Sequence, residues 1–242
     1  MNIKTEATNN FEALKNNIYP GRGIIIGESP DGKNIFQIYW IMGRSANSRN
    51  RLFVKENSGF VKTQAFDESK VEDPSLIIYF PVKHISNQHI VTNGDQTDTI
   101  FSFINDTKTF EDAIATREYE PDEPNFTPRI SGITNLKGAK YLYSLSSISK
   151  IAYDEPRALR SFYNYEKGMP GFGHFISTYT GDGNPLPSFT GAPLAMPLFA
   201  SAEETLEKYW NALNEENKIS ILIKTIEIDS GKFDIMIKNK FS

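Results

Sequence analysis

The stretch that decides the fold is GIIIG at residues 23–27 together with NIFQIYWIM at residues 34–42. The first run places β-branched isoleucines between two glycines and predicts a brief buried strand. The second run is rich in aromatic and β-branched side chains and predicts a returning strand. Because Pro30, Asp31 and Gly32 lie between the two runs and are typical of a tight turn, the strands are expected to pair as a hairpin.

Outward from this hairpin, most of the chain alternates between strand patterns and turns. Further strands are predicted at residues 52–54, 59–66, 76–82, 89–92, 130–135, 139–147, 157–165, 173–179, 219–228 and 233–237. Helices are predicted where Phe11, Leu14 and Ile18 recur at helical spacing, at residues 99–105, after Thr109 and after Ser201. Many hairpin-connected strands with few helices predict an α+β fold in which helices cover antiparallel sheet.

The composition favours one globular domain over residues 1–242, since 39% of the residues are hydrophobic and 23% are charged. No apolar run is long enough to span a bilayer, and residues 1–10 lack the apolar core of a signal peptide, so a cytoplasmic protein is expected. The absence of cysteine excludes disulfides, thiol nucleophiles and thiolate metal sites. His84 and His89 have no carboxylate at ligand spacing and are interpreted as structural residues rather than metal ligands.

The arginines are unevenly placed along the chain. The formal net charge of -4 argues against general attraction to nucleic acid, which normally needs a basic face. Yet Arg44, Arg49 and Arg51 lie close together, and Arg22 lies upstream of them. Guanidinium groups bind phosphate or carboxylate oxygens in pairs, and clustered like charges repel unless an anion lies between them. The cluster therefore favours a small anionic ligand, such as a phosphorylated metabolite, over a solvated basic hairpin end.

A second unusual stretch is YEPDEPNFTPRI at residues 119–130. Its prolines exclude a helix or a central strand, so a rigid polar loop is expected. A long loop with this many ionisable groups either presents chemistry or forms a solvated turn, and the stretch alone leaves both readings open. A further loop at residues 181–193 is rich in glycine, which would let the backbone approach a ligand or would simply form a surface excursion.

Several segments together resemble the archaeal-type inosine monophosphate (IMP) cyclohydrolases and their bacterial relatives. The matching segments are YPGR at residues 19–22, GRSANSRNR at residues 43–51, TNGDQTDTI at residues 92–100 and the loop at residues 119–130, with STY at residues 177–179 agreeing more loosely. The resemblance implies a single domain with the four-layer αββα sandwich of N-terminal-nucleophile hydrolases, in which two mainly antiparallel sheets are stacked, without their self-processing.

The sequence departs from the family pattern at three places. Residues 1–18 form a helical extension before Tyr19, Phe126 is inserted before Thr127, and the loop after Gly181 is longer. The extension would bury or displace a terminal amine, so a terminal nucleophile is not expected.

The implied reaction closes the second ring of the purine. The carboxamide nitrogen of the formylated imidazole ribonucleotide attacks the formyl carbon, water leaves, and IMP forms without a cofactor or a metal. The implied catalytic residues are Tyr119, Glu120 and Asp122 as acid/base candidates and Arg129 to polarise the formyl oxygen. The implied substrate-binding residues are Arg22, Arg44, Arg49, Arg51, Asn93, Asp98, Thr99, Asn125, Thr127 and Tyr179.

The expected partners are the purine nucleotide precursor and IMP, without nucleic acid or membrane, and a homo-oligomer is left open. Two alternatives to the cyclohydrolase also stay open. One is a non-catalytic relative that binds purine nucleotides, and the other is an amidohydrolase acting on a different formylated or amide substrate, since a fold does not fix a function.

Overall fold

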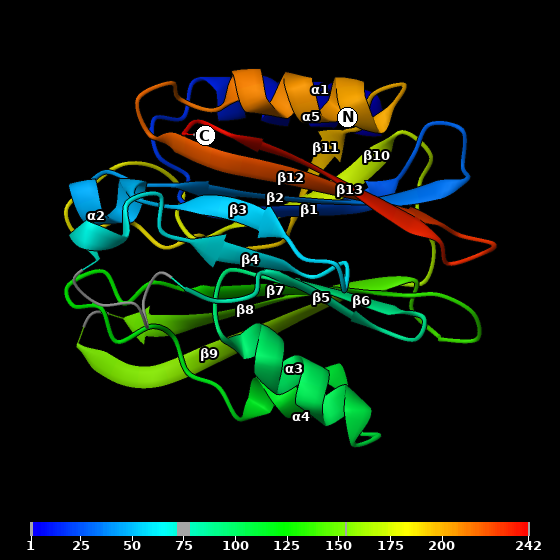
Figure 1. Ribbon diagram of the computed structural model, residues 1–242, viewed down its shortest axis with the longest axis horizontal. Coiled ribbons are helices and arrows are strands. Elements are labelled where there is room, and N and C mark those ends of the chain that lie inside the picture. The colour runs from blue at the N-terminus through cyan, green and yellow to red at the C-terminus, as the bar shows by residue number, and fades with distance from the viewer. Residues whose placement is uncertain (1, 72–77, 153, 242) are drawn as a thin grey trace.

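Two antiparallel sheets are stacked on each other in the computed structural model, which describes residues 2–71, 78–152 and 154–241 (Figure 1). The six-stranded sheet contains, in spatial order, β11 (Leu194–Pro197), β10 (Phe172–Ser177), β1 (Gly23–Glu28), β2 (Asn34–Met42), β12 (Lys218–Glu227) and β13 (Phe233–Asn239). The seven-stranded sheet contains β3 (Leu52–Lys55), β4 (Val61–Gln64), β5 (Val82–Ile85), β6 (Gln88–Thr92), β7 (Arg129–Asn135), β8 (Tyr143–Ala152) and β9 (Glu155–Tyr165). The arrangement confirms the predicted α+β fold with antiparallel sheets.

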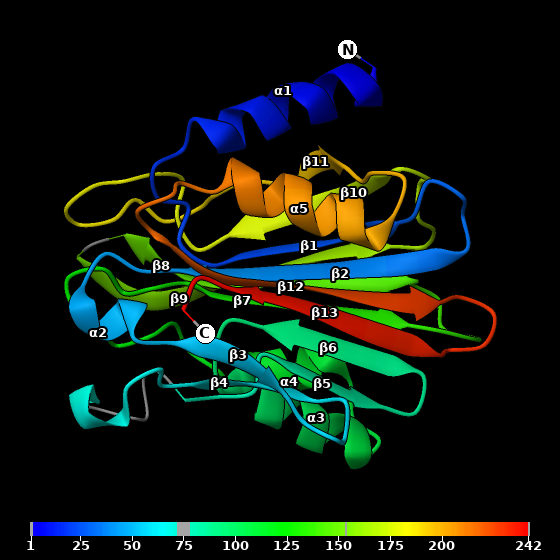
Figure 2. The same cartoon turned by 45° about the horizontal axis from the view of Figure 1, so that its top comes forward.

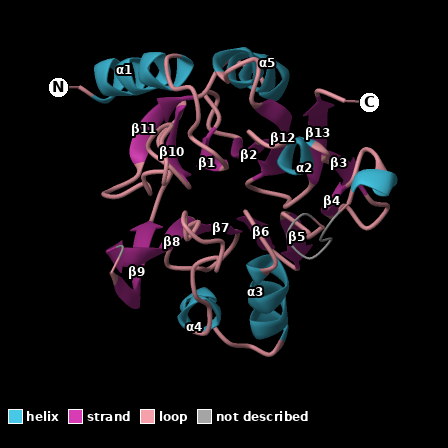
Figure 3. Ribbon diagram, turned by 90° about the vertical axis from the view of Figure 1, so that its left-hand side faces the viewer, coloured by secondary structure: helices cyan, strands magenta, loops and turns pink. Residues whose placement is uncertain are grey.

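The main helices lie on the outer faces of the two sheets (Figures 1 and 3). Helices α1 (Ile3–Lys15) and α5 (Ala202–Ala212) run side by side over the six-stranded sheet (Figure 2). Helices α3 (Gln96–Asn105) and α4 (Phe110–Ala115) lie over the seven-stranded sheet, while α2 (Ala46–Arg49) and the 3-10 helix η1 (Glu68–Lys70) are short turns at one end. None of the helices in the described part of the chain is long and apolar enough to cross a membrane.

The hairpin of β1 and β2 lies at the centre of the packing. Its register runs from Gly23 opposite Trp40 to Glu28 opposite Ile35, which confirms the predicted pairing. Because side chains alternate along a strand, Ile25 packs toward α1 and α5, whereas Ile24 and Ile26 pack between the sheets. Burying each such isoleucine contributes roughly 1.5–3 kcal/mol, so β1 is held from both faces.

Several predicted boundaries differ from the structure. The helix at the N-terminus ends at Lys15, so the prediction that Ile18 continues its apolar face is wrong and that side chain is exposed. Helix α3 begins already at Gln96, and β8 begins only at Tyr143. Of the predicted strand at 76–82, residues 76 and 77 lie outside the described residues, and β5 starts at Val82. Neither α2 nor β11 was predicted, because both are single short elements inside polar or proline-rich loops.

A group of polar side chains without partners is buried between the sheets. Lys224 on β12 is 0% exposed, and its Nζ lies 4.1 Å from the centre of the Phe233 ring without a hydrogen-bond partner among the described residues. Both ring nitrogens of His89 also lack partners within that part of the chain. Burial, with a smaller effect from Lys55, lowers the pKa of Lys224 to about 7, and burial followed by Lys224 lowers the pKa of His89 to about 2.

Lys224→Met is expected to raise the free energy of unfolding by on the order of 1–4 kcal/mol at neutral pH, because it removes a buried charge to which the described residues supply no anionic partner. The pKa of Lys224 falls from 10.5 to about 7 on folding, so the cost is complete below pH 7 and disappears as the pH rises toward 10.5. Urea unfolding of both proteins across this interval measures the effect. The exposed Lys232→Met is the control, and a difference that stays constant over the interval would contradict the assignment.

Candidate functional site

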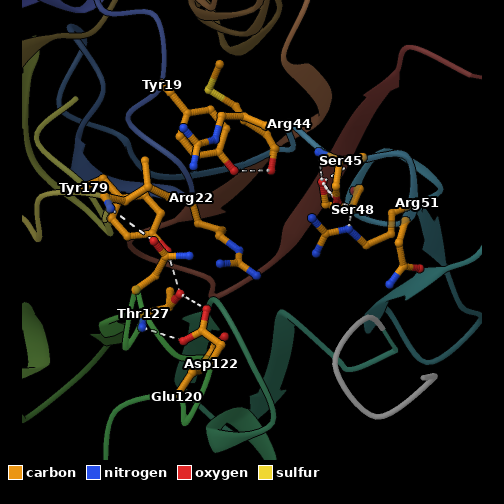
Figure 4. Close-up of a pocket in the computed structure, with 14 residues that line it drawn as sticks. Tyr19, Arg22, Arg44, Ser45, Ser48, Arg51, Glu120, Asp122, Thr127 and Tyr179 are labelled. Atoms are coloured by element: carbon orange, nitrogen blue, oxygen red, sulfur yellow. Dashed lines mark hydrogen bonds between the residues drawn. The ribbon is translucent and has the colours of Figure 1, made fainter. Parts of the chain in front are cut away.

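A cavity of about 350 Å³ opens at the end of the sandwich where α2 lies (Figure 4). Segments from both sheets converge on it, since β1 begins and β2 ends there and the proline-rich loop enters β7 beside them. We call it the front cavity. Its lining consists of Tyr19, Arg22, Met42, Arg44, Ser45, Asn47, Ser48, Arg51, Glu120, Asp122, Asn125, Thr127, Tyr179 and Leu186.

Arg22 is the residue directly before β1, and its side chain lines the front cavity. Gly21 makes this possible because its φ of +73° suits glycine and because a Cβ there would come within 2.2 Å of Thr178 Oγ1. The backbone of Arg22 is then fixed by Thr178, whose N–H donates to the Arg22 carbonyl at 2.9 Å. Arg22 Nε is buried without a hydrogen-bond partner among the described residues. Burial works against its charge, but the nearby Glu120 leaves the pKa of Arg22 well above its usual value.

Arg51 brings a second guanidinium into the same cavity. It is only 2% exposed, and its Nε donates to the Ser48 carbonyl at 2.8 Å. Burial and then the like charge of Arg22 lower the pKa of Arg51. A buried guanidinium at Arg51 that is disfavoured by the like charge of Arg22 in the same cavity favours an anion between them.

Glu120 forms the acidic side of the cavity opposite these arginines (Figure 4). Its backbone N–H donates to the Thr127 carbonyl at 2.9 Å, which holds the loop against the start of β7. Its carboxylate accepts no hydrogen bond from the described residues. Burial raises the pKa of Glu120 against the opposing effects of Arg22 and Arg129, and Asp122 adds to the rise.

A chain of hydrogen bonds crosses the cavity from Asp122 to Tyr179. Asp122 accepts from the Thr127 N–H at 2.6 Å and from the Thr127 hydroxyl, and the Thr127 and Tyr179 hydroxyl oxygens are 2.5 Å apart. Because an ionised carboxylate only accepts, Thr127 donates to Asp122 and Tyr179 donates to Thr127. Burial raises the pKa of Tyr179 to about 12, so this phenol keeps its proton at neutral pH and offers lone pairs to a ligand.

The loop at residues 181–193 borders the front cavity through Leu186. Arg44 Nη1 lies 2.5 Å from Asp182 Oδ1 and donates to the Gly183 carbonyl at 3.0 Å. The Leu186 N–H donates to Asn125 Oδ1 at 3.0 Å, which joins this loop to the proline-rich loop. Both long loops that were noted in the sequence therefore meet at one cavity.

Four of the residues predicted for the site lie elsewhere. Arg49 donates to the Gly43 carbonyl and to Asn217 instead of lining the cavity. Asp98 lies on the outer side of α3, where its carboxylate is 2.6 Å from Lys83 Nζ. The other two form hydrogen bonds outside both cavities: Thr99 accepts from Arg117, and the Tyr119 hydroxyl donates to the Pro156 carbonyl at 2.7 Å.

Asn93 and Arg129 line a separate, smaller cavity of about 40 Å³, which we call the rear cavity. Glu120 lines both cavities, and the other residues of the rear cavity are Tyr79, Gly94, Asp95 and Pro121. Both ends of the Asn93 amide are engaged, since its nitrogen donates to the Pro128 carbonyl and its oxygen accepts from Ile130 and Gln96. Arg129 Nη1 donates to Asp95 at 2.7 Å and to Gln96 at 2.9 Å.

Some lining residues were not predicted as site residues. Tyr19 belongs to the quoted segment at 19–22, and Ser45, Asn47 and Ser48 belong to the segment that contains the arginines, so the position in these segments was the available signal. Leu186 reaches the cavity through a long loop and carries no local signal. Within the described ranges, no group of three or more histidine or acidic side chains is placed to hold a metal ion.

Comparison with known proteins identifies relatives of this chain. The model of a family described as IMP cyclohydrolase-like protein matches residues 19–231. The IMP cyclohydrolase of Methanosphaera stadtmanae is 34% identical over 129 residues, which cover 52% of this chain and 62% of that protein. The IMP cyclohydrolase of Methanococcus maripaludis strain C7 is 28% identical over 150 residues, which cover 60% of this chain and 73% of that protein. The match to the Methanosphaera protein thus spans less than two thirds of its length.

Proposed function

Because this chain belongs to the family of IMP cyclohydrolase-like proteins, we propose that it closes the second purine ring of 5-formamidoimidazole-4-carboxamide ribonucleotide to give IMP and water. The observation that carries the proposal is the pair of guanidiniums, half-buried Arg22 and buried Arg51, which share one cavity with the carboxylate of Glu120. A cavity of about 350 Å³ is in the size range of small-ligand sites. We also infer that the two stacked sheets and their outer helices are those of the N-terminal-nucleophile hydrolases.

The 5′-phosphate is assigned to the side of the cavity formed by α2. Arg51 lies there beside Ser45 and Ser48 (Figure 4), and Asn47 also lines the cavity. A phosphate at this position would take charge-assisted hydrogen bonds from the guanidinium, and the hydroxyl and amide groups would complete its shell. Arg44 at the mouth adds positive charge, although its ion pair with Asp182 is half exposed and therefore weak.

The imidazole with its two reacting groups is assigned to the other side, between Arg22 and Glu120. Arg22 has a buried Nε for which the described residues supply no hydrogen-bond acceptor, which suits a donor to the formyl oxygen as negative charge develops there. Arg129 is bound to Asp95 and Gln96 behind Glu120, so this oxygen is placed at Arg22 and not at Arg129. Glu120 would take the proton of the carboxamide nitrogen, and Tyr179 and Asp122 would orient the carboxamide and ribose.

The test is the formation of IMP from the formylated ribonucleotide, followed by absorbance and chromatography. The wild-type protein is expected to form IMP, and Arg22→Met is expected to lower kcat by about 10²–10³-fold because it removes a donor to the developing oxyanion. Arg157→Met is the control, since Arg157 is exposed and, among the described residues, its side chain pairs with Glu155 alone.

Other results would point to other functions. A higher melting temperature with IMP but no product would indicate a nucleotide-binding protein without turnover. Release of formate without ring closure would indicate an amidohydrolase. Full activity of Arg22→Met would show that this guanidinium does not act on the reacting groups.

A further inference from the structure

Glu120 lines both the front cavity and the rear cavity. It is shared by the front cavity, which contains Arg22 and Arg51, and the rear cavity, which contains Asp95 and Arg129. A group that acts on a substrate in the front cavity is therefore also in contact with the space behind it. Asp95 at the border of this space has a side chain that is 55% exposed, so the rear cavity lies next to solvent.

The rear cavity has the size and polarity of a water site. Its volume of about 40 Å³ exceeds the roughly 30 Å³ that one water occupies in the liquid. The side chains of Asn93, Arg129 and Asp95 already have protein partners, and the Tyr79 hydroxyl is 2.7 Å from that of Tyr39. The carboxylate of Glu120 is the ionisable group on this wall that accepts no hydrogen bond from the described residues. A half-buried carboxylate in that state takes its hydrogen bonds from water.

The proposed reaction also needs a place for protons and for water. The bond between the carboxamide nitrogen and the formyl carbon forms, and the bond between that carbon and the formyl oxygen breaks. One proton from the carboxamide nitrogen and one from the formamide nitrogen reach that oxygen, which leaves as water. A single carboxylate carries one proton at a time, and a nucleotide fills the front cavity during the step.

We propose that the rear cavity holds a water that exchanges protons with Glu120, and that the water released by ring closure leaves through this cavity. This inference rests on the proposed function and adds a path behind the carboxylate. Gly94, Asp95 and Arg129 are its positioning residues, because they shape the space and do not touch the substrate.

Gly94 keeps the rear cavity open. A Cβ at this position would lie 2.7 Å from Gln96 Oε1, 2.8 Å from Arg129 Nη1 and 3.6 Å from Glu120 Oε1. The backbone of Gly94 does not have a positive φ, so alanine is opposed there by these side-chain contacts and not by a left-handed backbone. A methyl group would therefore displace Gln96 Oε1 and Arg129 Nη1 and take up space in the rear cavity, which Gly94 lines, whereas Gly94 does not line the front cavity.

Gly94→Ala is the experiment that tests this proposal. It is expected to lower kcat by about ten-fold or more, since proton transfer by a placed group contributes 10²–10⁴-fold. The KM of the ribonucleotide and the dissociation constant of IMP should stay within about two-fold, because no phosphate or base contact changes. Gly181→Ala is the matched control, because a Cβ there meets only Asn17 Oδ1 at 3.8 Å and Gly181 lines neither cavity.

The pH profile separates loss of the water from mere displacement of Arg129. Arg129 lowers the pKa of Glu120, so displacing it would move the acid limb of the kcat profile to higher pH, and activity would return above that limb. Loss of the water should instead lower kcat at every pH. Recovery of full kcat at higher pH, or an unchanged kcat, would overturn the proposal.

A crystal structure of the wild-type protein with IMP provides a second test that does not depend on the folding of a variant. An ordered water within hydrogen-bond distance of Glu120 in the rear cavity is expected, and a dry rear cavity would overturn the proposal. If the wild-type protein forms no IMP, the proposed function fails. If it forms IMP and Gly94→Ala retains its kcat, only the role of the rear cavity fails.

Discussion

Glu120→Gln is expected to lower kcat by about 10²–10⁴-fold, while IMP still raises the melting temperature of the variant. The amide has nearly the same shape as the carboxylate but cannot take a proton from the carboxamide nitrogen. It also removes the negative charge beside Arg22, so the affinity for the anionic nucleotide should be equal or tighter. Steady-state kinetics and thermal shifts with IMP measure the two effects separately.

Glu118→Gln is the matched control for this prediction. Glu118 precedes the same loop, and its exposed carboxylate pairs with Arg160 and not with a cavity residue. A kcat of Glu120→Gln within three-fold of the wild type would exclude Glu120 as the base. In the wild type, kcat should fall as the pH drops through the pKa of Glu120, which burial places above its usual 4.5.

The second large effect is expected for Arg51→Met. The variant should bind IMP about 100-fold more weakly, because a charge-assisted pair of hydrogen bonds to the phosphate is lost. The melting temperature without ligand should stay equal or rise, because the substitution removes a buried charge that Arg22 destabilises. Calorimetric titration with IMP and thermal unfolding without ligand measure the two quantities.

Arg49→Met is the control because Arg49 comes from the same segment but binds Gly43 and Asn217 outside the cavity. It should retain the affinity for IMP and lose stability, which is the opposite of the result for Arg51. Equal loss of affinity in both variants would show that the segment acts through its net charge rather than through Arg51.

The fold followed from local patterns where those patterns were strong. The hairpin of residues 23–42 and the capping box at Thr109 were predicted because alternation, turn residues and capping residues act within a few positions. The segments that line the front cavity were also found, since Arg22, Arg51 and Glu120 come from three quoted stretches.

Individual assignments within those stretches depended on geometry that no local pattern reveals. Arg49 and Arg51 differ because the single turn of α2 ends between them and directs one guanidinium outward and the other inward. Asp98 and Thr99 were expected in the site, but α3 begins at Gln96 and carries Asp98 to its outer side. Distances between segments far apart in sequence are set by the packing of the sheets, which a single sequence does not give.

The bond of Gln37 across the sheets has a mechanical consequence. Its amide donates to the His89 carbonyl and to Thr134 Oγ1, both at 2.9 Å, so it fastens β2 of one sheet to β6 and β7 of the other. Arg22 precedes β1 of the first sheet, and Glu120 lies in the loop before β7 of the second sheet. A shift of one sheet along the other would therefore change the distance between these two side chains. Gln37 thus keeps the two sheets in a fixed alignment, and this alignment keeps Arg22 and Glu120 at a fixed separation.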